Sequence, residues 1–496
     1  MAPTLARGAE LFPSTQGDTM HQNYINGRFV AAGQADEIAV INPSNRQTIS
    51  SIPDTPAAQV DEAIAAARAA QRAWARRPAI ERAGYLRKIA AGIRARAEEI
   101  ARTLSEEQGK VLPLARVEAQ FTADYLDYMA EWARRIEGEI IPSDRPGETI
   151  MLMRQAIGVV GGILPWNFPF FLIARKMGPA LLTGNTIVIK PSEETPNNAA
   201  IFADILSQVD LPAGVYNQIY GRGGNAGRVL AGHAGVDMIS FTGSVDTGSA
   251  IMAAAAPNIT KLNLELGGKA PAIVLEDADL DLAARAIAAS RVINTGQVCN
   301  CAERVYVQRS VAEAFTEKLV AQVAAARWGN PLQDETLDMG PLINQAGRDK
   351  VAAMLQRAVD AGAQVATGGQ ADDRDGGFFF QPTVLVNCQH DWEIMQKEIF
   401  GPVVPVAVVD SLDEAIDKAN DTTYGLTSSI YTRSLDAALR ASTELEFGET
   451  YVNRENFEAM QGFHAGVKKS GIGGADGKHG VYEYTQTHTV YIQRQS

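Results

Sequence analysis

The sequence has few cysteines, no long apolar run and no excess of basic residues. Three cysteines among 496 residues cannot build a disulfide framework, so we expect free thiols and a cytoplasmic location. No uncharged apolar stretch reaches about 18 residues, and we therefore expect no membrane partner. The formal net charge of −13 also argues against nucleic acids and anionic membranes, because both attract basic proteins.

The length and composition are those of an ordinary α/β protein with more than one domain. Hydrophobic residues make up 46% of the chain and charged residues 21%, which is typical of a globular protein. A single hydrophobic core stops growing at about 250 to 300 residues, so 496 residues predict two or three domains. Residues 1–19 lack periodicity, and we expect them to form a disordered leader.

Helical periodicity begins near residue 57 and continues to residue 132. Apolar residues recur every three or four positions and predict three long surface helices, at 61–75, 80–109 and 114–135. The next stretch, residues 138–158, alternates around a Pro-Gly turn and predicts a β-hairpin outside the main domains. Such an arm often pairs with another chain.

Two series of short β-branched runs follow the hairpin. The first series extends from GVVGGIL to APAIVLED, and the second from RVYVQRS to ETYVNRE. Strands that alternate with helices indicate parallel βαβ units. We therefore predict an α/β fold with a doubly wound sheet in one domain and a second α/β domain after it.

Cys299 and Cys301 lie one residue apart in INTGQVCNCAERVYV. A zinc site normally takes four ligands, and neither flank supplies another Cys or His, so we expect no metal ion. A disulfide across one residue would be badly strained. Considered alone, the pair is most often found as packed core thiols.

Two further segments change the interpretation of this pair. KLNLELGGKAP places Glu265 in an apolar stretch. Burying a carboxylate there costs free energy unless it has a partner or takes part in proton transfer. LPWNFPFF places Asn167 directly after a predicted strand. A thiol, a carboxylate and an amide donor are the nucleophile, base and oxyanion donor of acyl chemistry at a carbonyl.

The motifs PWNFP, LELGGK, GQVC, KEIFGPV and KSGIG occur in this order, and through them the sequence resembles the NAD(P)-dependent aldehyde dehydrogenase superfamily from about residue 22 onward. The resemblance implies that the Cys299 thiolate attacks the aldehyde to form a thiohemiacetal and then a thioester. The Asn167 side chain and the Cys299 backbone N–H would hold the oxyanion. Glu265 would activate the hydrolytic water, which favours hydrolysis over transfer to coenzyme A.

The other two cysteines match no catalytic position. The resemblance assigns Cys301 to packing, with a redox partner of Cys299 as the open alternative. Cys388, in VNCQHD, has no motif around it and is predicted to be structural. A non-catalytic binding protein and a thiol-redox protein that uses Cys299 and Cys301 are the alternatives from other functional classes.

The resemblance also divides the chain. It implies a Rossmann-like NAD-binding domain at 20–137 with 154–267, a catalytic domain at 268–480, and an oligomerisation arm at 138–153 with 481–496. In the family this arm exchanges edge strands with a C-terminal tail like THTVYIQRQ. A homodimer or homotetramer is therefore expected.

Two glycine-rich stretches compete for the phosphates of the cofactor. GRGGNA, residues 221–226, fits the G-x-G-x-x-A fingerprint, whereas FTGSVDTG, residues 241–248, does not. The resemblance nevertheless places the pyrophosphate at the second stretch, on a helix N-terminus. A carboxylate at Glu193 would accept from ribose hydroxyls and repel a 2′-phosphate, so NAD is expected over NADP. The cofactor-binding residues expected on this basis are Trp166, Lys190, Ser192, Glu193, Gly223, Gly227, Phe241, Gly243, Ser244, Leu266, Glu398 and Phe400.

Polar residues stand where family members that oxidise apolar aldehydes carry aromatic ones. A tunnel lined by them suits a substrate with hydroxyl groups, because an apolar substrate would leave buried donors and acceptors unpaired. The sequence is most similar to the family branch that oxidises small 2-hydroxyaldehydes such as lactaldehyde and glycolaldehyde. A dehydrogenase of another polar aldehyde, such as succinate semialdehyde, is the alternative. The expected substrate-binding residues are Phe171, Arg175, Asn300, Glu458 and His464.

Overall fold

The computed structural model describes residues 20–495. Its first sheet has eight strands in the order β2-β1-β9-β8-β7-β10-β11-β21, and the five from β9 to β11 run parallel. Within this parallel part, β7 comes first in the chain, β8 and β9 follow on one side of it, and the chain then crosses to form β10 and β11 on the other side. This reversal opens a crevice at the carboxyl ends of β7 and β10. The strands are β1 (Asn23–Ile25), β2 (Arg28–Val30), β7 (Val159–Ile163), β8 (Thr186–Lys190), β9 (Tyr216–Gln218), β10 (Met238–Thr242), β11 (Lys261–Glu265) and β21 (Gly471–Ile472).

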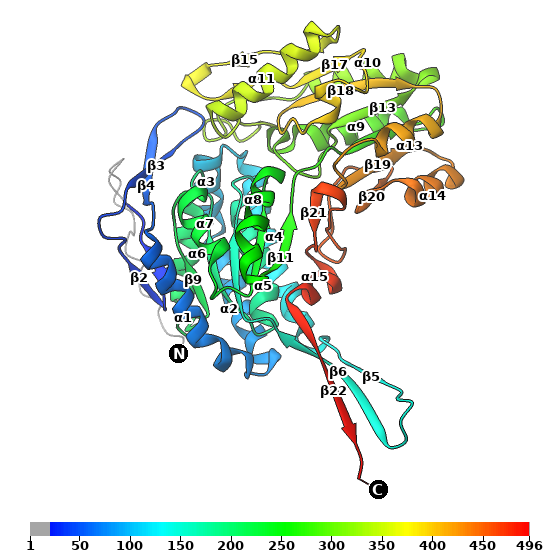
Figure 1. Cartoon of the computed structure of the whole chain (residues 1–496). Helices are drawn as coiled ribbons and strands as arrows, with labels where there is room; N and C mark the ends of the chain where they lie inside the picture. Colours follow the sequence, from blue (N-terminus) through cyan, green and yellow to red (C-terminus); the bar gives the residue numbers. More distant parts are fainter. Residues whose placement is uncertain (1–19, 496) are drawn as a thin grey trace, which may run out of the picture.

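Helices cover both faces of this sheet (Figure 1). Every residue of α5 is buried, because its sequence PFFLIARKMGPALL is apolar on nearly all sides and must be enclosed by neighbours. α4 packs on α5 and brings its own side chains to the same region. The helices of this part are α1 (Ala57–Ala75), α2 (Ala79–Ala95), α3 (Ala97–Gln108), α4 (Leu112–Glu131), α5 (Pro169–Leu182), α6 (Asn197–Ser207), α7 (Arg228–Gly232) and α8 (Val245–Ala255).

The helix predicted at 80–109 is two helices, and that prediction is wrong. The chain leaves helical geometry at Arg96, between α2 and α3, with φ −117° and ψ 18°. No Pro or Gly marks the break. The Arg96 side chain pairs with Glu99 and Asp204 at the break, and these tertiary contacts outweigh a local preference that favours continuity.

A second sheet, of seven strands, has the order β14-β17-β18-β13-β12-β19-β20. Apart from the β14 edge, its strands run parallel. The predicted α/β fold with a doubly wound sheet is confirmed. The strands are β12 (Pro271–Val274), β13 (Arg304–Gln308), β14 (Gln364–Thr367), β17 (Thr383–Val386), β18 (Val403–Val409), β19 (Thr427–Tyr431) and β20 (Glu449–Val452), and the helices are α9 (Leu280–Val292), α10 (Ala312–Ala324), α11 (Gln345–Asp360), α12 (Glu393–Gln396), α13 (Leu412–Asn420) and α14 (Leu435–Glu444).

The C-terminal part of the chain returns to the first sheet. β21 pairs antiparallel with β11, with Glu265 opposite Gly471, although β21 falls within the range 268–480 that the sequence assigned to the second domain. This pairing brings the loops on either side of β21 next to the end of β11. It therefore places C-terminal side chains beside Glu265.

A three-stranded antiparallel sheet projects from the body as a narrow arm (Figure 1). It consists of β5 (Glu139–Ile141), β6 (Glu148–Ala156) and β22 (Thr485–Gln493). β6 continues three residues past the predicted limit at 153, and residues 481–483 belong to the short helix α15 (Gly477–Glu483) rather than to the arm. β22 and β6 pair over nine positions.

Smaller elements complete the chain. The antiparallel pair β3 (Glu37–Ile41) and β4 (Thr48–Pro53) lies near the first sheet, and β15 (Ala371–Asp372) pairs with β16 (Phe379–Phe380). Within residues 20–495, no helix is both long enough and apolar enough to cross a membrane. The predicted leader at 1–19 lies outside the described residues.

Candidate active site

Two cavities meet at Cys299. The first has a free volume of about 170 Å³ and is bounded by α4, α5 and the loops that carry Cys299 and Glu458. The second, of about 200 Å³, lies at the crevice formed by the carboxyl ends of β7 and β10. Asn167, Thr242 and Cys299 line both cavities, so the thiol is reachable from either side. The three predicted catalytic residues Cys299, Glu265 and Asn167 all line the first cavity.

The loop that carries Cys299 has an unusual backbone. Asn294, Thr295 and Gly296 have consecutive left-handed conformations, with φ of 48°, 60° and 71°. Such non-glycine residues cost about 1 to 3 kcal/mol each and persist only where the surroundings hold them. Thr295 Oγ1 donates to the Gly340 carbonyl at 3.0 Å, and the Gln297 side chain accepts from a backbone N–H at 2.9 Å. Cys299 therefore sits on a loop fixed by hydrogen bonds on both sides.

Asn167 sits directly after β7 and just before α5. Its amide Nδ2 donates to the Gln297 carbonyl at 3.0 Å, while its Oδ1 is buried without a hydrogen-bond partner among the described residues. The Asn167 carbonyl accepts from Lys110 Nζ at 2.8 Å and from Asn294 Nδ2 at 3.1 Å. The amide thus faces the Cys299 loop, with its backbone held from behind.

A buried ion pair supports this turn. Lys110 bonds Glu118 on α4, and both side chains are fully buried. One Glu118 oxygen accepts from the backbone N–H groups of Phe170 and Phe171 at the start of α5, at 3.0 and 3.1 Å. A carboxylate at that position satisfies unpaired N–H groups and complements the helix dipole. Lys110 and Glu118 are positioning residues that sequence reasoning missed.

The guanidinium of Arg175 lies among three carboxylates. It bonds both oxygens of Asp476, and its Nη1 lies 3.6 Å from Glu458 and 3.8 Å from Glu265. Thr242 Oγ1 also donates to Glu265 at 3.3 Å. Burial alone would raise the pKa of Glu265, but Arg175 and nearby Lys176 outweigh it and hold that pKa below the ordinary value. Glu265 is therefore ionised at neutral pH and fit to act as a base.

The Cys299 thiol has a pKa above its ordinary value. Burial is the largest cause, and the imidazole of His464 acts in the opposite direction. His464 is 2% exposed, its Nδ1 lies 2.6 Å from Glu449, and it does not line the first cavity. Burial and Arg175 oppose protonation of this imidazole, but neighbouring Glu458, Cys299 and Glu449 raise its pKa well above the ordinary value. The structure thus places His464 behind the nucleophile rather than against the expected substrate.

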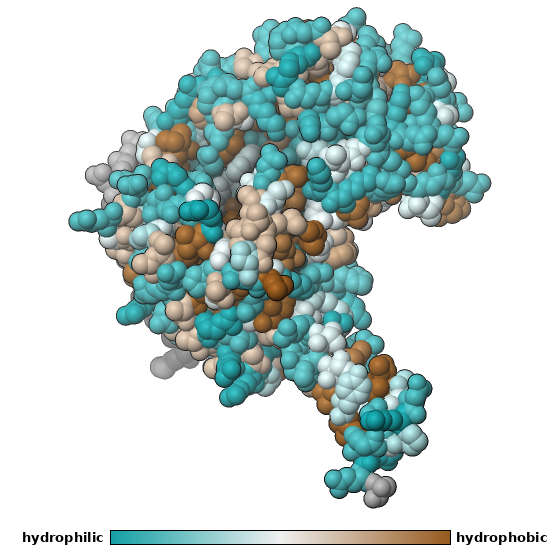
Figure 2. Space-filling view, in the orientation of Figure 1, coloured by the Kyte–Doolittle hydropathy of each residue, from teal (hydrophilic) through white to brown (hydrophobic). Residues whose placement is uncertain are grey.

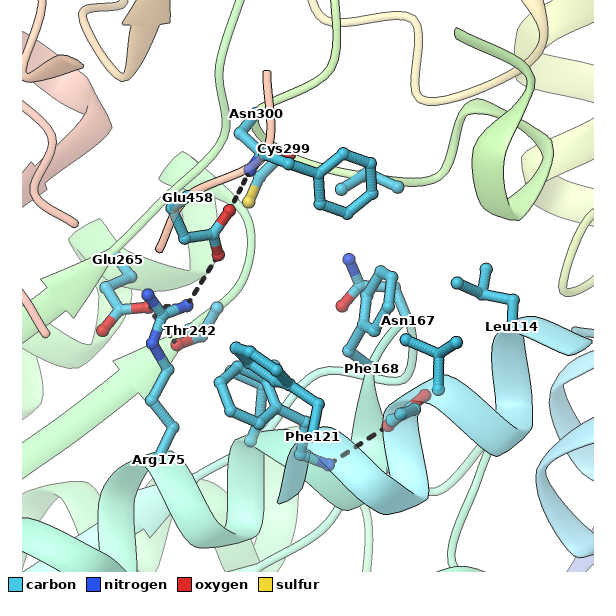
Figure 3. A pocket seen from close by; sticks show the side chains of 16 residues that line it. Leu114, Phe121, Asn167, Phe168, Arg175, Thr242, Glu265, Cys299, Asn300 and Glu458 are labelled. Carbon is cyan, nitrogen blue, oxygen red and sulfur yellow. Dashed lines mark hydrogen bonds and ion pairs between the residues drawn. The ribbon is translucent and has the colours of Figure 1, made fainter. Parts of the chain in front are cut away.

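The first cavity is not polar throughout, and the expected polar tunnel needs correction. Figure 3 shows Arg175, Glu265, Asn300 and Glu458 on one side, with Asn300 Nδ2 donating to Glu458. The rest of the lining is mainly apolar, and the predicted Phe171 joins the two parts: its ring centroid lies 5.5 Å from the Arg175 guanidinium carbon and 4.9 Å from the ring centroid of Phe121. The apolar lining consists of Leu114, Val117, Phe121, Phe168, Phe171, Leu172, Val298 and Phe457.

The second cavity has the features of a dinucleotide cleft. It leads to the N-terminus of α8, where Ser244 Oγ caps the helix by accepting from the Thr247 N–H. A Cβ on Gly243 would lie 2.4 Å from the Phe241 ring, so the packing under this turn requires glycine. Of the predicted cofactor residues, this cavity is lined by Trp166, Gly243, Ser244, Leu266, Glu398 and Phe400.

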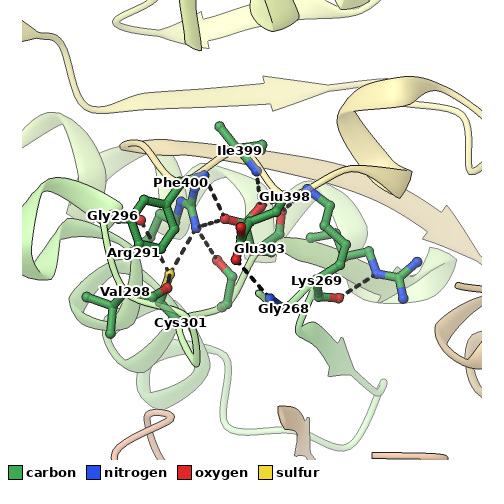
Figure 4. A network of polar contacts seen from close by, with 12 residues as sticks. Gly268, Lys269, Arg291, Gly296, Val298, Cys301, Glu303, Glu398, Ile399 and Phe400 are labelled. Atoms are coloured by element: carbon green, nitrogen blue, oxygen red, sulfur yellow. Dashed lines mark hydrogen bonds and ion pairs between the residues drawn. The ribbon is translucent and has the colours of Figure 1, made fainter. Parts of the chain in front are cut away.

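The turn that carries Glu398 and Phe400 is held by a buried carboxylate (Figure 4). Glu303 accepts from the Ile399 N–H at 2.9 Å and the Phe400 N–H at 3.1 Å. Phe400 itself is left-handed, with φ 56°. Burial opposes the ionisation of Glu303, but two buried cations outweigh it and lower its pKa to about 2. These cations are Arg291 at 2.7 Å and Lys269 at 2.8 Å.

Glu398 has a raised pKa. Burial is the main cause and the charge of Glu303 adds to it, giving a pKa of about 7. The Gly268 N–H donates to Glu398 at 2.8 Å, and a Cβ on Gly267 would lie 2.7 Å from the carboxyl group. A Cβ on Gly268 would lie 2.5 Å from the Cys299 carbonyl. The Gly-Gly pair of the LELGGK motif therefore leaves space for the Glu398 carboxyl group and for the backbone of the Cys299 loop.

The remaining predicted cofactor residues gather after β8. Lys190 Nζ lies 2.9 Å from Glu193, and the Gly223 N–H donates to the other Glu193 oxygen at 3.1 Å. A Cβ on Gly227 would lie 3.5 Å from the Lys190 side chain. Ser192 is buried beside them, and its hydroxyl accepts from a backbone N–H at 3.3 Å. By contrast, predicted Phe241 is buried beneath Gly243 and supports the cleft from below.

Cys301 belongs to the Glu303 network. It is 1% exposed, and Arg291 Nη1 donates to its sulfur at 3.0 Å. Burial raises the pKa of this thiol to about 12, so it stays protonated and inert. Cys388 is also buried and unpaired with another thiol.

Reactivity toward iodoacetamide should separate the three cysteines. We expect Cys299 to be alkylated first, because it alone lines the cavities, and Cys301 and Cys388 to be spared in the folded protein. The thiolate is the reactive form, so a pKa above 9.0 predicts that the rate still rises with pH at pH 9. Peptide mass spectrometry over time gives each rate. Cys301→Ser serves as the control and should leave the Cys299 rate unchanged, whereas a plateau near neutral pH would contradict the raised pKa.

Comparison with known proteins agrees with this geometry. The chain is 59% identical over 473 residues to lactaldehyde dehydrogenase of Escherichia coli (strain K12), covering 95% of this chain and 98% of that protein. A crystal structure of that enzyme matches with a TM-score of 0.95 over 96% of this chain and 99% of the other. The chain is also 42% identical over 475 residues to 3,6-anhydro-alpha-L-galactose dehydrogenase of Vibrio sp. (strain EJY3), covering 95% of this chain and 99% of that protein.

More distant structures share the fold. A structure of betaine aldehyde dehydrogenase from Staphylococcus aureus in complex with NAD+ is 35% identical, with a TM-score of 0.92 over 95% of this chain and 94% of the other. The model of the aldehyde dehydrogenase family matches residues 29–490. These matches confirm the resemblance carried by the motifs, and the chain belongs to the aldehyde dehydrogenase family.

Proposed function

We propose that this protein oxidises small 2-hydroxyaldehydes, lactaldehyde or glycolaldehyde, to carboxylic acids with NAD as the hydride acceptor. The observation that carries the proposal is the position of Cys299, between a cavity with one charged wall and a dinucleotide cleft. Lactaldehyde dehydrogenase is the name of the 59% identical relative. An oxidation that needs substrate on one side of a thiol and cofactor on the other fits this arrangement.

Different residues of the chain carry out the attack on the aldehyde and the hydrolysis of the thioester. The Cys299 thiolate bonds to the aldehyde carbon, and the oxyanion is stabilised by the Asn167 amide and the Cys299 N–H. When bound in the cleft, the nicotinamide dinucleotide supplies the hydride acceptor. Glu265, kept ionised by Arg175, takes a proton from water as that water attacks the thioester carbon. The carboxylic acid leaves and the thiol is regenerated.

The charged wall selects the hydroxyl group of the substrate. Glu458 and Asn300 are bonded to each other beside the nucleophile, and both have hydrogen-bonding capacity for a 2-hydroxyl group. Succinate semialdehyde fits less well, because Arg175 already has three carboxylate neighbours. A fourth carboxylate from the substrate would meet like charges rather than a free cation.

NAD is proposed over NADP because of Glu193. Burial opposes its ionisation, but Lys190 outweighs burial and holds the pKa of Glu193 below its ordinary value. The carboxylate is therefore charged and would repel a 2′-phosphate while accepting from ribose hydroxyls. The free thiols favour a reducing, cytoplasmic compartment.

The arm is proposed to join copies of this chain in a homodimer or homotetramer. Its three strands form a thin sheet with large apolar side chains on the outside, among them Ile140 at 76% and Tyr491 at 64% exposed. Figure 2 shows hydrophobic patches at the surface of the arm. A thin sheet of this kind needs a covering layer to be stable in water, and a second copy would supply it.

Replacing the base should separate the two chemical stages. Glu265→Gln is expected to leave the first turnover, seen as a burst of NADH absorbance, while steady-state turnover falls about a hundredfold or more because thioester hydrolysis loses its base. Stopped-flow absorbance resolves both phases. Cys299→Ala should abolish the burst as well, and Glu276→Gln, at an exposed carboxylate, should change neither phase. A full steady-state rate in Glu265→Gln would refute the assignment of the base.

Removing the charged wall should cost the hydroxylated substrate more than its plain analogue. Glu458→Leu is expected to lower kcat/KM for lactaldehyde about tenfold, because a buried hydrogen bond is lost and its partner is left unpaired. Propionaldehyde, which lacks the hydroxyl, should change little. Glu455→Leu, three residues away and outside the cavity, is the matched control. Equal losses for both aldehydes would show that Glu458 supports the fold instead.

Charging the arm should dissociate the oligomer. The double substitution Ile140→Asp with Tyr491→Asp places one carboxylate on each face of the arm, because Ile140 pairs with Met151 and Tyr491 with Ile150. We expect a lower mass by light scattering at micromolar concentration. Leu332→Asp, at an exposed leucine away from the arm, controls for the added charge. A monomeric mass for the unmodified protein would overturn the proposed assembly.

A further inference from the structure

The first cavity has more room than a small 2-hydroxyaldehyde needs. Its free volume is about 170 Å³, and one water-sized group needs only about 10 to 15 Å³ of such volume. Lactaldehyde has three carbons and two oxygens. Its polar groups are satisfied at the inner end, next to Cys299, where the charged wall lies. The rest of the cavity remains for something else.

The unused part is apolar and continuous. Figure 3 shows Leu114, Phe121 and Phe168 across the cavity from Glu458 and Asn300. Among the described residues that line this side, Glu118 is the one that takes part in an ion pair, with Lys110. Its oxygens are engaged by Lys110 and by two backbone N–H groups. An apolar wall of this extent offers no hydrogen bonds to a substrate. It favours alkyl or aryl groups.

The apolar wall continues to the surface. Leu114 and Val117 also line a shallow outer depression of about 350 Å³, whose other residues are apolar except for Asp338: Val111, Pro113, Ala289, Val292, Ile293, Leu337 and Asp338. Val117 is 60% exposed at this mouth. A chain that enters along this wall therefore meets apolar side chains from the inner cavity to solvent, with room at its far end.

The chemistry of the substrate gives the direction of such a chain. In a 2-hydroxyaldehyde, the carbon next to the carbonyl carries a hydroxyl group and one carbon substituent. With the carbonyl carbon at the Cys299 sulfur and the hydroxyl on the charged wall, the carbon substituent is directed to the apolar wall. For lactaldehyde this substituent is a methyl group, which covers little of that surface.

We infer that the substrate class extends to 2-hydroxyaldehydes with an apolar tail of several carbons, the tail lying along the wall from Phe171 to Val117. This inference rests on the proposed function, since it uses the same nucleophile and hydroxyl contacts. Each buried methylene removes apolar surface from water, and we expect kcat/KM to rise about threefold per added methylene until the tail leaves the mouth.

A substrate series with the intact holoenzyme tests this. We would measure kcat/KM for lactaldehyde, 2-hydroxybutanal, 2-hydroxyhexanal and 2-hydroxyoctanal, and for hexanal as the analogue without the hydroxyl. The expected result is a rise along the hydroxylated series, carried mainly by KM, with hexanal about tenfold below 2-hydroxyhexanal. Hexanal matching 2-hydroxyhexanal would count against the proposed hydroxyl contact.

A variant at the mouth tests whether the trend depends on this apolar wall or only on the overall hydrophobicity of the substrate. Val117→Asp should lower kcat/KM for 2-hydroxyoctanal about tenfold more than for lactaldehyde, because the tail then meets a charge. Val365→Asp, at an exposed valine remote from the cavity, should leave that ratio unchanged. A flat or falling series with lactaldehyde still oxidised would overturn this inference and leave the proposed function intact. If no 2-hydroxyaldehyde of any length were oxidised, the proposed function would fall with it.

Discussion

The guanidinium of Arg175 is the charge on which the catalytic side of the cavity depends. It is 4% exposed, so it is stable only because carboxylates surround it. Asp476 holds it in place, and its remaining charge keeps Glu265 ionised in a site where burial would otherwise protonate it. The same charge lies 3.6 Å from Glu458 and allows a second carboxylate beside the nucleophile. The ionisation of Glu265 and the polarity of the cavity wall at Glu458 therefore both depend on the charge of Arg175.

Two further buried ion groups support the loops on either side of the nucleophile. The Lys110–Glu118 pair holds the turn after β7, and Glu303 with Arg291 and Lys269 holds the turn before β18. Buried ion pairs are often no more stabilising than apolar packing, because both charges lose their water. Here each carboxylate accepts two consecutive backbone N–H groups. Their contribution is to hold backbone in one geometry, which apolar side chains cannot do.

The sequence predicted the parts of the site that are local in the chain. Motifs and strand ends pointed to Cys299, Glu265 and Asn167, which line one cavity, and to the crevice, because a residue just after a parallel strand lies at one edge of the sheet. Partners from distant segments were missed: Asp476 is 301 residues from Arg175, and nothing near either one signals the contact. His464 was expected in the cavity but is buried with Glu449. The helix expected at 80–109 breaks without Pro or Gly, through contacts that only the folded chain supplies.

The division of the cavity into two walls has a consequence for specificity. On the charged wall, selectivity and catalysis are coupled, because removing Arg175 would let burial raise the pKa of Glu265 and protonate the base. Glu458 can be lost more safely, since its absence leaves Arg175 with fewer carboxylates to balance and Glu265 stays ionised. The apolar wall carries no charge that reaches Glu265. Substitutions there are therefore expected to alter the fit of a substrate without changing the charge that keeps Glu265 ionised.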